Sequence, residues 1–332
     1  MASHASAQYV GGYIEVKGYS EVMSISAVLN DWRVKRSGDS VQAGWRIGSF
    51  FNAKRHWSIG VEQRLDYLLN FTPQTARFYE SLENNEIEPG TYPLFLEVNA
   101  AKSQGLFASY FIPLSISSSI KVTARALQGA KLQVGSLSGT GTYSVAPSGT
   151  RNVEYQYNLD YHYDSNEILT TPNSKVSGYG YSFDVRYEGR FDRVYLSMNA
   201  QDLLYRYHWQ AGVDRGCLSR PIAPGCSVKT GTDEFVQSLP SQLDIEARYH
   251  LSRSLKKPVP SVYISSEWWG SHESHGIGLV NLGVAGGYHW KEKMFALRYE
   301  SDWVQVKWRF DQPDPQRAQY WQLNARVTWP LL

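Results

Sequence analysis

An aspartate and a histidine two residues apart could form a catalytic pair in the stretch VEYQYNLDYHYD, residues 153–164. A carboxylate at Asp160 that accepts a hydrogen bond from His162 would orient the imidazole as a general base for water. The same spacing also arises on one face of any charged β-strand, because alternate side chains point to the same side. A hydrolytic site would need a second acidic pair, which the sequence does not identify, so we favour a charged strand face.

Residue types that bind zinc occur in SHESHG, residues 271–276, which contains His272, Glu273 and His275. We expect a short solvated loop there without a further fixed ligand. The glycine-rich stretch 129–143 lacks the Lys-Ser/Thr ending of a phosphate-binding loop. The sequence therefore predicts no metal and no cofactor.

The chain has two cysteines, Cys217 and Cys226, in the stretch CLSRPIAPGC. Two cysteines that close a short loop indicate a disulfide formed in an oxidising compartment, and two free thiols are the alternative. Residues 210–240 are rich in Gly, Pro, Ser and Thr, so we expect a long loop.

Composition excludes some classes of protein. The 332 residues carry 33 basic and 31 acidic side chains, so a basic surface for nucleic acid is not expected. No stretch approaches the about 18 uncharged apolar residues of a membrane-spanning helix. A mildly polar mean hydropathy combined with 23 Tyr and 11 Trp is typical of transmembrane β-barrels.

Apolar and polar residues alternate through most of the chain, and helical spacing is absent at comparable length. The pattern predicts an all-β chain of about fourteen strands, within a range of twelve to sixteen. The predicted strands lie near 22–36, 41–51, 57–69, 91–102, 105–115, 119–143, 151–163, 177–188, 193–209, 241–251, 259–270, 276–290, 294–310 and 318–329. Phase slips at 200–203 and 301–304 indicate β-bulges.

The predicted connections fall into two groups. Short charged turns are expected at 52–56, 188–192, 252–258 and 290–293, and longer segments at 70–90, 164–176, 210–240 and 311–317. Short turns at one end and long loops at the other are typical of outer-membrane barrels.

Alternation alone leaves two interpretations open, a soluble sandwich that buries its apolar face and a barrel that turns this face to lipid. We favour lipid because the strands are long, Tyr and Trp gather near strand ends, and charges of both signs lie well inside the strands. In a closed barrel these charges would face a hydrated lumen.

The pattern resembles the bacterial outer-membrane β-barrel (porin-like) superfamily over essentially the whole chain. The resemblance implies a single closed antiparallel transmembrane barrel over residues 9–332, with short periplasmic turns and longer extracellular loops. It also implies contact with the lipid bilayer and lipopolysaccharide, and insertion by the barrel-assembly machinery. Residues 1–8, with Ala5-Ser6-Ala7, look like the remainder of a signal or tag.

Two features depart from the family's patterns. The C-terminus NARVTWPLL carries Pro330 and ends in Leu332, whereas such barrels usually end in Phe. Omptin-like outer-membrane proteases use an Asp-x-His pair, which Asp160 and His162 match, but omptins have fewer strands and two further acids.

The polar parity predicts which charged side chains line the lumen. These are Arg46, Glu62, Arg64, Asp66, Lys121, Arg125, Asp184, Arg186, Glu188, Asp244, Glu246, Arg248, Arg298, Glu300, Asp302 and Arg326. Both signs are interspersed, so we do not expect a strongly anion-selective pore.

These predictions favour a non-enzymatic outer-membrane channel that passes hydrophilic solutes, oligomers or polymers along a wall of mixed charge. A first alternative is a barrel closed by its own charges that serves as a docking or scaffold component of an envelope secretion or export assembly. A second is a hydrolase at the rim of the barrel that uses Asp160 and His162.

Overall fold

The computed structural model describes residues 8–25, 38–54, 56–84, 88–164, 176–251, 260–314 and 316–331. Among these residues it has sixteen strands and the helix α2. The elements are β1 (Tyr9–Ser20), β2 (Ser40–Lys54), β3 (Trp57–Phe71), α2 (Pro73–Asn84), β4 (Gly90–Pro113), β5 (Ser118–Val145), β6 (Arg151–Tyr163), β7 (Ser177–Phe191), β8 (Val194–Arg220), β9 (Val228–Gln237), β10 (Gln242–His250), β11 (Ser261–Trp269), β12 (His272–Asn281), β13 (Val284–His289), β14 (Met294–Glu300), β15 (Val304–Phe310) and β16 (Tyr320–Pro330).

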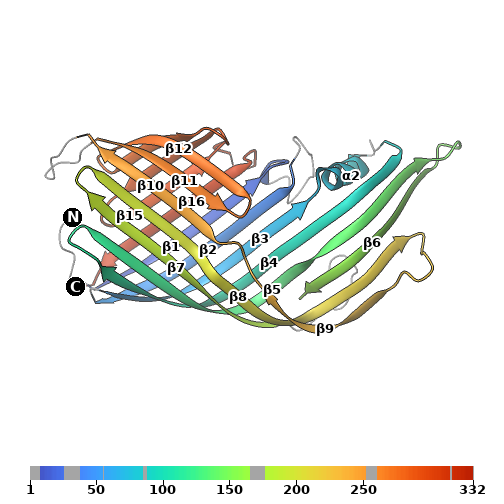
Figure 1. Ribbon diagram of the computed structural model, residues 1–332, viewed down its shortest axis with the longest axis horizontal. Helices are drawn as coiled ribbons and strands as arrows, with labels where there is room; N and C mark the ends of the chain where they lie inside the picture. Colours follow the sequence, from blue (N-terminus) through green and yellow to red (C-terminus); the bar gives the residue numbers. More distant parts are fainter. Residues whose placement is uncertain are drawn as a thin grey trace.

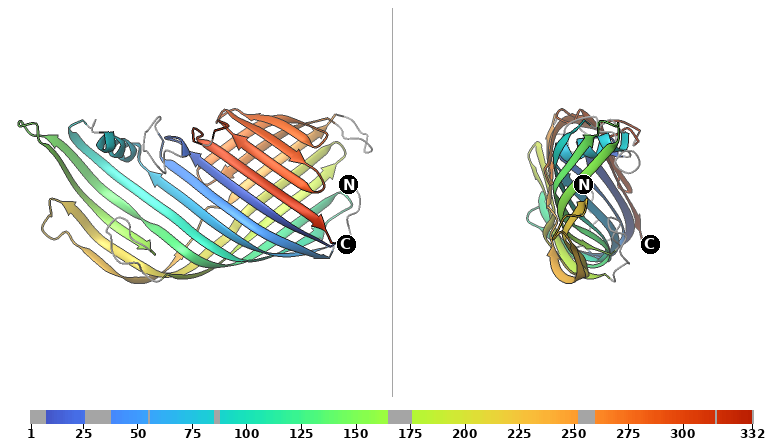
Figure 2. Two further views of the ribbon diagram at one scale, coloured as in Figure 1. Left: turned by 180° about the vertical axis from the view of Figure 1, so that it is seen from behind. Right: turned by 90° about the vertical axis from the view of Figure 1, so that its right-hand side faces the viewer.

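Fourteen of the described strands close into one antiparallel barrel (Figures 1 and 2). The hydrogen-bonded ring runs β1-β2-β3-β4-β5-β7-β8-β10 and then in chain order to β16. β1 pairs with both β2 and β16, and this joins the two ends of the sheet. The prediction of an all-β barrel of about fourteen strands is confirmed.

Three strands are far longer than a bilayer requires. β4, β5 and β8 contain 24, 28 and 27 residues, whereas about 9–11 residues cross a bilayer. The first half of β5 pairs with β7 and its second half with β6. β8 pairs with β7 and β10 near its start and with β6 and β9 near its end. The far parts of β4, β5 and β8, together with β6 and β9, therefore form a five-stranded extension of the barrel, here called the wall (Figure 1).

The wall accounts for the stretch 153–164. Leu159, Tyr161 and Tyr163 are buried on its outer side, where the two tyrosine rings stack with centroids 5.5 Å apart. Asp160 and His162 have the opposite parity and lie on the inner side. The apolar parity of this strand is thus covered by protein instead of lipid.

Helix α2 packs on the outer side of the wall and lies in a segment predicted to be a loop. Thr72 caps it, because the Thr75 main-chain N–H donates to Thr72 Oγ1 over 3.2 Å. Pro73 occupies the first helical position, where its missing N–H costs nothing. Phe78 of the helix packs against Tyr92 and Tyr143, and this covers the tip of β4 and β5. Within the described residues no helix has the length and apolarity to span a membrane.

Several strand boundaries differ from the prediction. β1, residues 9–20, was not predicted, because Gly11, Gly12 and Gly18 interrupt its apolar parity. The predicted strand at 22–36 is wrong where it is described, since residues 22–25 belong to no strand, and residues 26–36 lie outside the described residues. The segments 91–102 and 105–115 form one strand, β4.

Two tight turns were also missed. Leu282 and Gly283 both have positive φ and reverse the chain between β12 and β13, although leucine is rare in such a turn. The expected bulge at 301–304 is a turn between β14 and β15. A missed turn reverses the direction in which the following strand was predicted to run. The segment 290–293 therefore lies at the end of the barrel opposite to the predicted one. The bulge near 200–203 is confirmed.

Both termini lie at one end of the barrel, and the wall rises from the other (Figures 1 and 2). In outer-membrane barrels the short-turn end that holds the termini faces the periplasm. Residues 1–7 of the signal-like start lie outside the described residues, so that part of the prediction stays a prediction.

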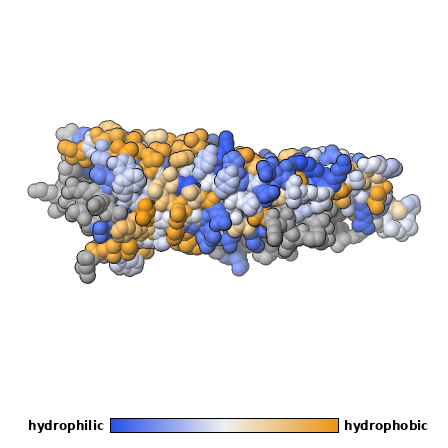
Figure 3. All heavy atoms as spheres, turned by 90° about the horizontal axis from the view of Figure 1, so that it is seen from below, coloured by the Kyte–Doolittle hydropathy of each residue, from blue (hydrophilic) through white to orange (hydrophobic). Residues whose placement is uncertain are grey.

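Apolar side chains cover the outside of the barrel. Exposed residues include Ile47, Ile59 and Leu106 on one flank and Leu279 and Leu297 on the other. Figure 3 shows hydrophobic colour concentrated over the barrel and more hydrophilic colour toward the wall. An apolar band of this kind fits a bilayer, and the wall then projects beyond it.

Tryptophans mark both borders of this band. Trp57, Trp303 and Trp329 lie at the end with the termini, and Trp290 lies at the other end, all at least half exposed. Trp209, at the end of the predicted strand 193–209, is instead buried inside with Tyr207, because the bulge in β8 turns it inward.

Candidate lumen site

The lumen is crossed by side chains of opposite charge. The register of the strands places the predicted charged parity on the inner side, where ion pairs join strands that are not neighbours in the ring. Two buried carboxylates that the sequence analysis did not identify, Asp202 and Glu267, lie at the centres of two groups of ion pairs. We call these groups the Asp202 layer and the Glu267 layer.

In the Asp202 layer one carboxylate from β8 binds two arginines from the far side of the ring. Arg64 Nη1 lies 2.7 Å from Asp202 Oδ1, and Arg46 Nη2 contacts Asp202 Oδ2. All three side chains are nearly or fully buried. Arg64 also binds Asp66 over 2.7 Å. Through these contacts β8 is tied to β2 and β3 across the lumen.

The bulge in β8 places Asp202 in this position. The register against β7 slips on both sides of Phe183, which pairs with Leu203. Asp202 and Leu204 both have φ of 56°, a left-handed conformation that bends the strand. The main-chain N–H of Asp202 donates to Asp184 Oδ1 over 3.0 Å, which fixes the bulge. The phase slip was visible in the sequence, but parity cannot assign a side for a residue inside it.

Arg125 from β5 continues this layer toward the end of the barrel that holds Tyr9 and Pro330. Its Nε lies 2.8 Å from Glu62 Oε1, and its Nη2 lies 2.6 Å from Asp184 Oδ2. The Tyr13 hydroxyl from β1 donates to Glu62 Oε2 over 2.7 Å. Each carboxylate is thus shared by donors from separate strands.

The Glu267 layer lies in the other half of the lumen. Glu267 from β11 contacts Lys17 from β1 and Arg309 from β15, and it is 1% exposed. The Lys17 ammonium lies 4.1 Å from the centre of the Trp269 ring. Glu267 was not identified because no second charge on its strand marks the polar parity.

Further ion pairs surround this layer. Glu246 binds Arg248 and, over 2.7 Å, Arg298, and both arginines also approach Glu300. Asp244 lies 3.8 Å from both Lys307 and Arg309. These charges largely neutralise one another.

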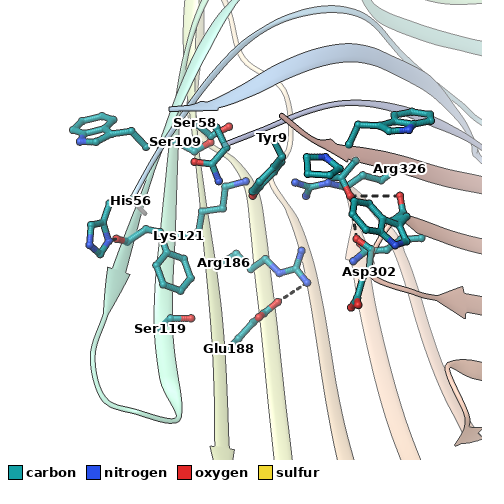
Figure 4. A pocket seen from close by; sticks show the side chains of 18 residues that line it. Tyr9, His56, Ser58, Ser109, Ser119, Lys121, Arg186, Glu188, Asp302 and Arg326 are labelled. Atoms are coloured by element: carbon teal, nitrogen blue, oxygen red, sulfur yellow. Dashed lines mark hydrogen bonds and ion pairs between the residues drawn. The ribbon is translucent and has the colours of Figure 1, made fainter. Parts of the chain in front are cut away.

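The remaining predicted residues line a cavity at the end of the barrel that holds Tyr9 and Pro330, here called the periplasmic cavity (Figure 4). It has a volume of about 480 Å³. Lys121, Arg186, Glu188 and Arg326 project from strands, and Asp302 lies in the turn after β14. Arg186 binds Glu188 over 2.5 Å. On β7 the next residue that faces inward beyond Arg186 is Asp184, which belongs to the Asp202 layer. This layer therefore begins directly next to the cavity.

The segment 210–240 is a β-hairpin and not a loop, which corrects the prediction. β8 continues to Arg220, β9 returns along it, and the two strands pair over ten residues. Cys217 and Cys226 form a disulfide near the tip. The hairpin belongs to the wall.

The Asp160–His162 pair lies on the inner side of the wall with two further residues, Arg215 and Asp233. Arg215 binds Asp160 over 3.1 Å and Asp233 over 2.7 Å. The imidazole nitrogens of His162 lie 3.9 and 3.7 Å from the two carboxylates, beyond hydrogen-bond range. The sequence analysis missed Asp233 because it placed the residue in a loop.

Electrostatics in this group do not favour a general base. Burial, which includes a ring contact with Phe235, lowers the pKa of His162 below its usual range, although Asp160 acts in the opposite direction. The hydrogen bond from Arg215 lowers the pKa of Asp233. Both carboxylates are therefore occupied by the guanidinium group, and neither orients the imidazole.

The SHESHG segment is also not the expected loop, because residues 272–276 begin β12. Alternation places His272 inside and Glu273 and His275 outside, where these two side chains form an ion pair over 2.7 Å. The three residues cannot converge on one ion. Among the described residues no group of three His, Cys, Asp or Glu side chains could hold a metal.

No family model and no curated protein matches this chain. Solved structures similar to it include the toluene transporter TodX of P. putida, with 10% identity, a TM-score of 0.40, and coverage of 98% of this chain and 89% of the other. The β domain of the Bordetella autotransporter BrkA gives 10% identity, a TM-score of 0.32, and coverage of 98% and 99%. The Escherichia coli outer-membrane protease OmpT gives 7%, 0.29, and 99% and 98%. At these values the similarity is confined to general barrel architecture.

The chain's own architecture decides its class. Fourteen antiparallel strands form a closed ring in the described residues, with an apolar outer band, tryptophans at both borders and an ion-paired interior. Closed barrels are the only β-structures that satisfy every backbone group within a bilayer. These features identify the chain as an integral membrane β-barrel.

Proposed function

We propose that this protein is an outer-membrane channel for small hydrophilic solutes and that the Asp202 layer closes it in this structure. The single observation that carries the proposal is the composition of the barrier. Every described strand belongs to the barrel or the wall, and α2 packs outside, so among the described residues no strand or helix crosses the lumen and the Asp202 layer consists of ion-paired side chains. Side chains that are joined by ion pairs can separate without unfolding any element.

The width of the barrel supports this proposal. Eight-stranded barrels are filled by their own side chains, and barrels of 16–18 strands leave an aqueous channel. Fourteen strands leave space that is here divided between ion pairs and the 480 Å³ cavity. That volume lies within the about 300–1,000 Å³ typical of small-molecule sites.

Planar-bilayer recording of the purified protein tests the channel. We expect discrete conductance steps, with occupancy of the open level that rises with salt as ion pairs are screened. Liposome swelling with neutral sugars of increasing size would then give the size limit. A barrel that is folded, as shown by its heat-modifiable migration, yet conducts nothing across voltage and pH would overturn the proposal.

The wall favours a second candidate function, a docking or scaffold component of an envelope assembly. A five-stranded sheet beyond the membrane is more than a channel requires, and β9 pairs only with β8 among the described strands. Contact with lipopolysaccharide and insertion by the barrel-assembly machinery stay predictions, as does any secretion partner.

Shortening the hairpin separates the two functions. Gly212 and Thr232 are paired in register, so a two-residue Asn-Gly turn can join them in place of residues 213–231. The ring pairing of β8 with β10 lies below this cut, at 194–201, so the barrel should fold. A scaffold would lose its partner in cross-linked envelopes, whereas a channel would keep its size limit.

A further inference from the structure

The periplasmic cavity carries an excess of positive charge. Lys121 from β5, Arg186 from β7 and Arg326 from β16 all line it (Figure 4). Two acids also line it, Glu188 and Asp302. Glu188 neutralises Arg186, and Asp302 is exposed in a turn at the rim. The cavity therefore differs from the rest of the lumen.

Two of these cations have no ion-pair partner among the described residues. Lys121 and Arg326 are both partly buried, and no carboxylate of the described chain lies within 4.0 Å of their charged nitrogens. Higher in the lumen every arginine named above binds at least one acid. Removing a cation from water without a partner is unfavourable, and in this respect Lys121 and Arg326 differ from the ion-paired arginines higher in the lumen.

The surroundings of the two cations suit an anion. The Arg326 guanidinium lies over the Phe50 ring, 4.5 Å from its centre, and this contact limits its orientations. Hydroxyl groups of Tyr9 and Ser119 line the same cavity and can donate hydrogen bonds. Charge-assisted hydrogen bonds from Lys and Arg are the strongest ones available to carboxylates and phosphates.

We propose that this cavity binds a small solute that bears a carboxylate or phosphate group, held between Lys121 and Arg326. The inference rests on the proposed channel function and gives the class of solute, which is anionic. From the mixed charges alone we did not expect a strongly anion-selective pore, because the alternation identifies the lumen charges without their partners. The expected preference for anions comes from Lys121 and Arg326, which have no ion-pair partner among the described residues.

Isothermal titration calorimetry on the barrel in zwitterionic nanodiscs tests the site, with inorganic phosphate and D-glucuronate as probes and D-glucose as the neutral comparison. We expect both anions to bind at low ionic strength and glucose not to bind. The double substitution Lys121→Gln/Arg326→Gln should weaken anion binding by at least about tenfold, because two charge-assisted contacts are lost. The matched control is Lys131→Gln, which removes an exposed cation from the same strand and should bind as the wild type does.

Three outcomes would overturn the inference. The first is that neither anion binds, and the second is that the double variant binds anions as well as the wild type does. The third is that phosphatidylglycerol stays bound to the wild type and is lost from the double variant. That result would assign the two cations to a lipid head group. Native mass spectrometry in phosphatidylglycerol nanodiscs reads the third outcome. Binding does not require conduction, so a barrel that conducts without binding anions refutes only this inference, and one that binds without conducting refutes only the channel.

Discussion

Replacing Asp202 by asparagine removes the charge that joins β8 to β2 and β3. The side chain keeps its size, so the change is confined to electrostatics. Arg46 is then left with only the Gln201 amide oxygen at 3.2 Å among its described partners, whereas Arg64 keeps Asp66. Loss of one partner from a buried pair costs about 3–5 kcal/mol. Since one arginine stays paired, we expect the lower end, about 3 kcal/mol.

Urea unfolding in lipid vesicles measures this loss, and planar-bilayer recording measures its consequence for the lumen. We expect Asp202→Asn to unfold at lower urea and to spend more time at the open level, because Arg46 is free to leave the layer. Asp160→Asn is the control. It removes an aspartate from a more exposed ion pair in the wall and should cost at most about 1 kcal/mol.

A double variant separates the loss of a charge pair from damage to the bulge. Arg46→Gln together with Asp202→Asn removes both charges, so stability should partly recover while the open level stays more populated. Unfolding at the wild-type urea concentration together with unchanged conductance in Asp202→Asn would refute the account of the layer.

Three further predictions concern other parts of the molecule. Glu267→Gln leaves Lys17 and Arg309 facing each other without their shared carboxylate, so urea unfolding in vesicles should show a loss of about 3–5 kcal/mol. Cys217→Ser should expose the tip of the wall hairpin to proteinase K, detected by mass spectrometry, while heat-modifiable migration of the barrel stays unchanged. The lowered pKa of His162 means that its stabilising effect is present above the unfolded pKa of about 6.5 and is lost as pH falls through the lower folded value. Protection of the β6 amides from hydrogen exchange, corrected for the intrinsic rate at each pH, should accordingly fall at acidic pH, and His162→Asn should remove that dependence.

The sequence predicted the barrel because the alternation of apolar and charged side chains assigns both an apolar outer face and a charged inner face to each strand. Glu62 and Asp244 could be assigned to the polar face because each lies in an unbroken strand with charges two residues away. The predicted number of strands agrees with the ring because errors offset one another. The strand at 22–36, the wall strand at 151–163 and the division of β4 added three, whereas β1 and two turns were missed. One of these turns was missed because Leu282 occupies a position that usually takes Asn or Gly.

The centres of the two charged layers could not be predicted from parity. Asp202 lies inside a bulge, where the side of the sheet changes, and Glu267 is the one charged residue of β11. Which strands face each other across a closed ring depends on the order of pairing, and the wall changes that order by inserting β6 and β9. Asp233 was missed for the same reason, because its strand has no place in a simple up-and-down count.

The chemistry of the Asp202 layer favours the channel over the scaffold. A barrel that only needs to be sealed would be sealed better by apolar side chains, because buried ion pairs are often no more stabilising than well-packed hydrophobic residues. Ion pairs have an advantage where water must enter, since each separated charge can be hydrated, whereas an apolar seal excludes water at any separation. Asp202, Arg46 and Arg64 place such pairs at the point where side chains from opposite parts of the ring meet. A closed state built in this way is one that water can open.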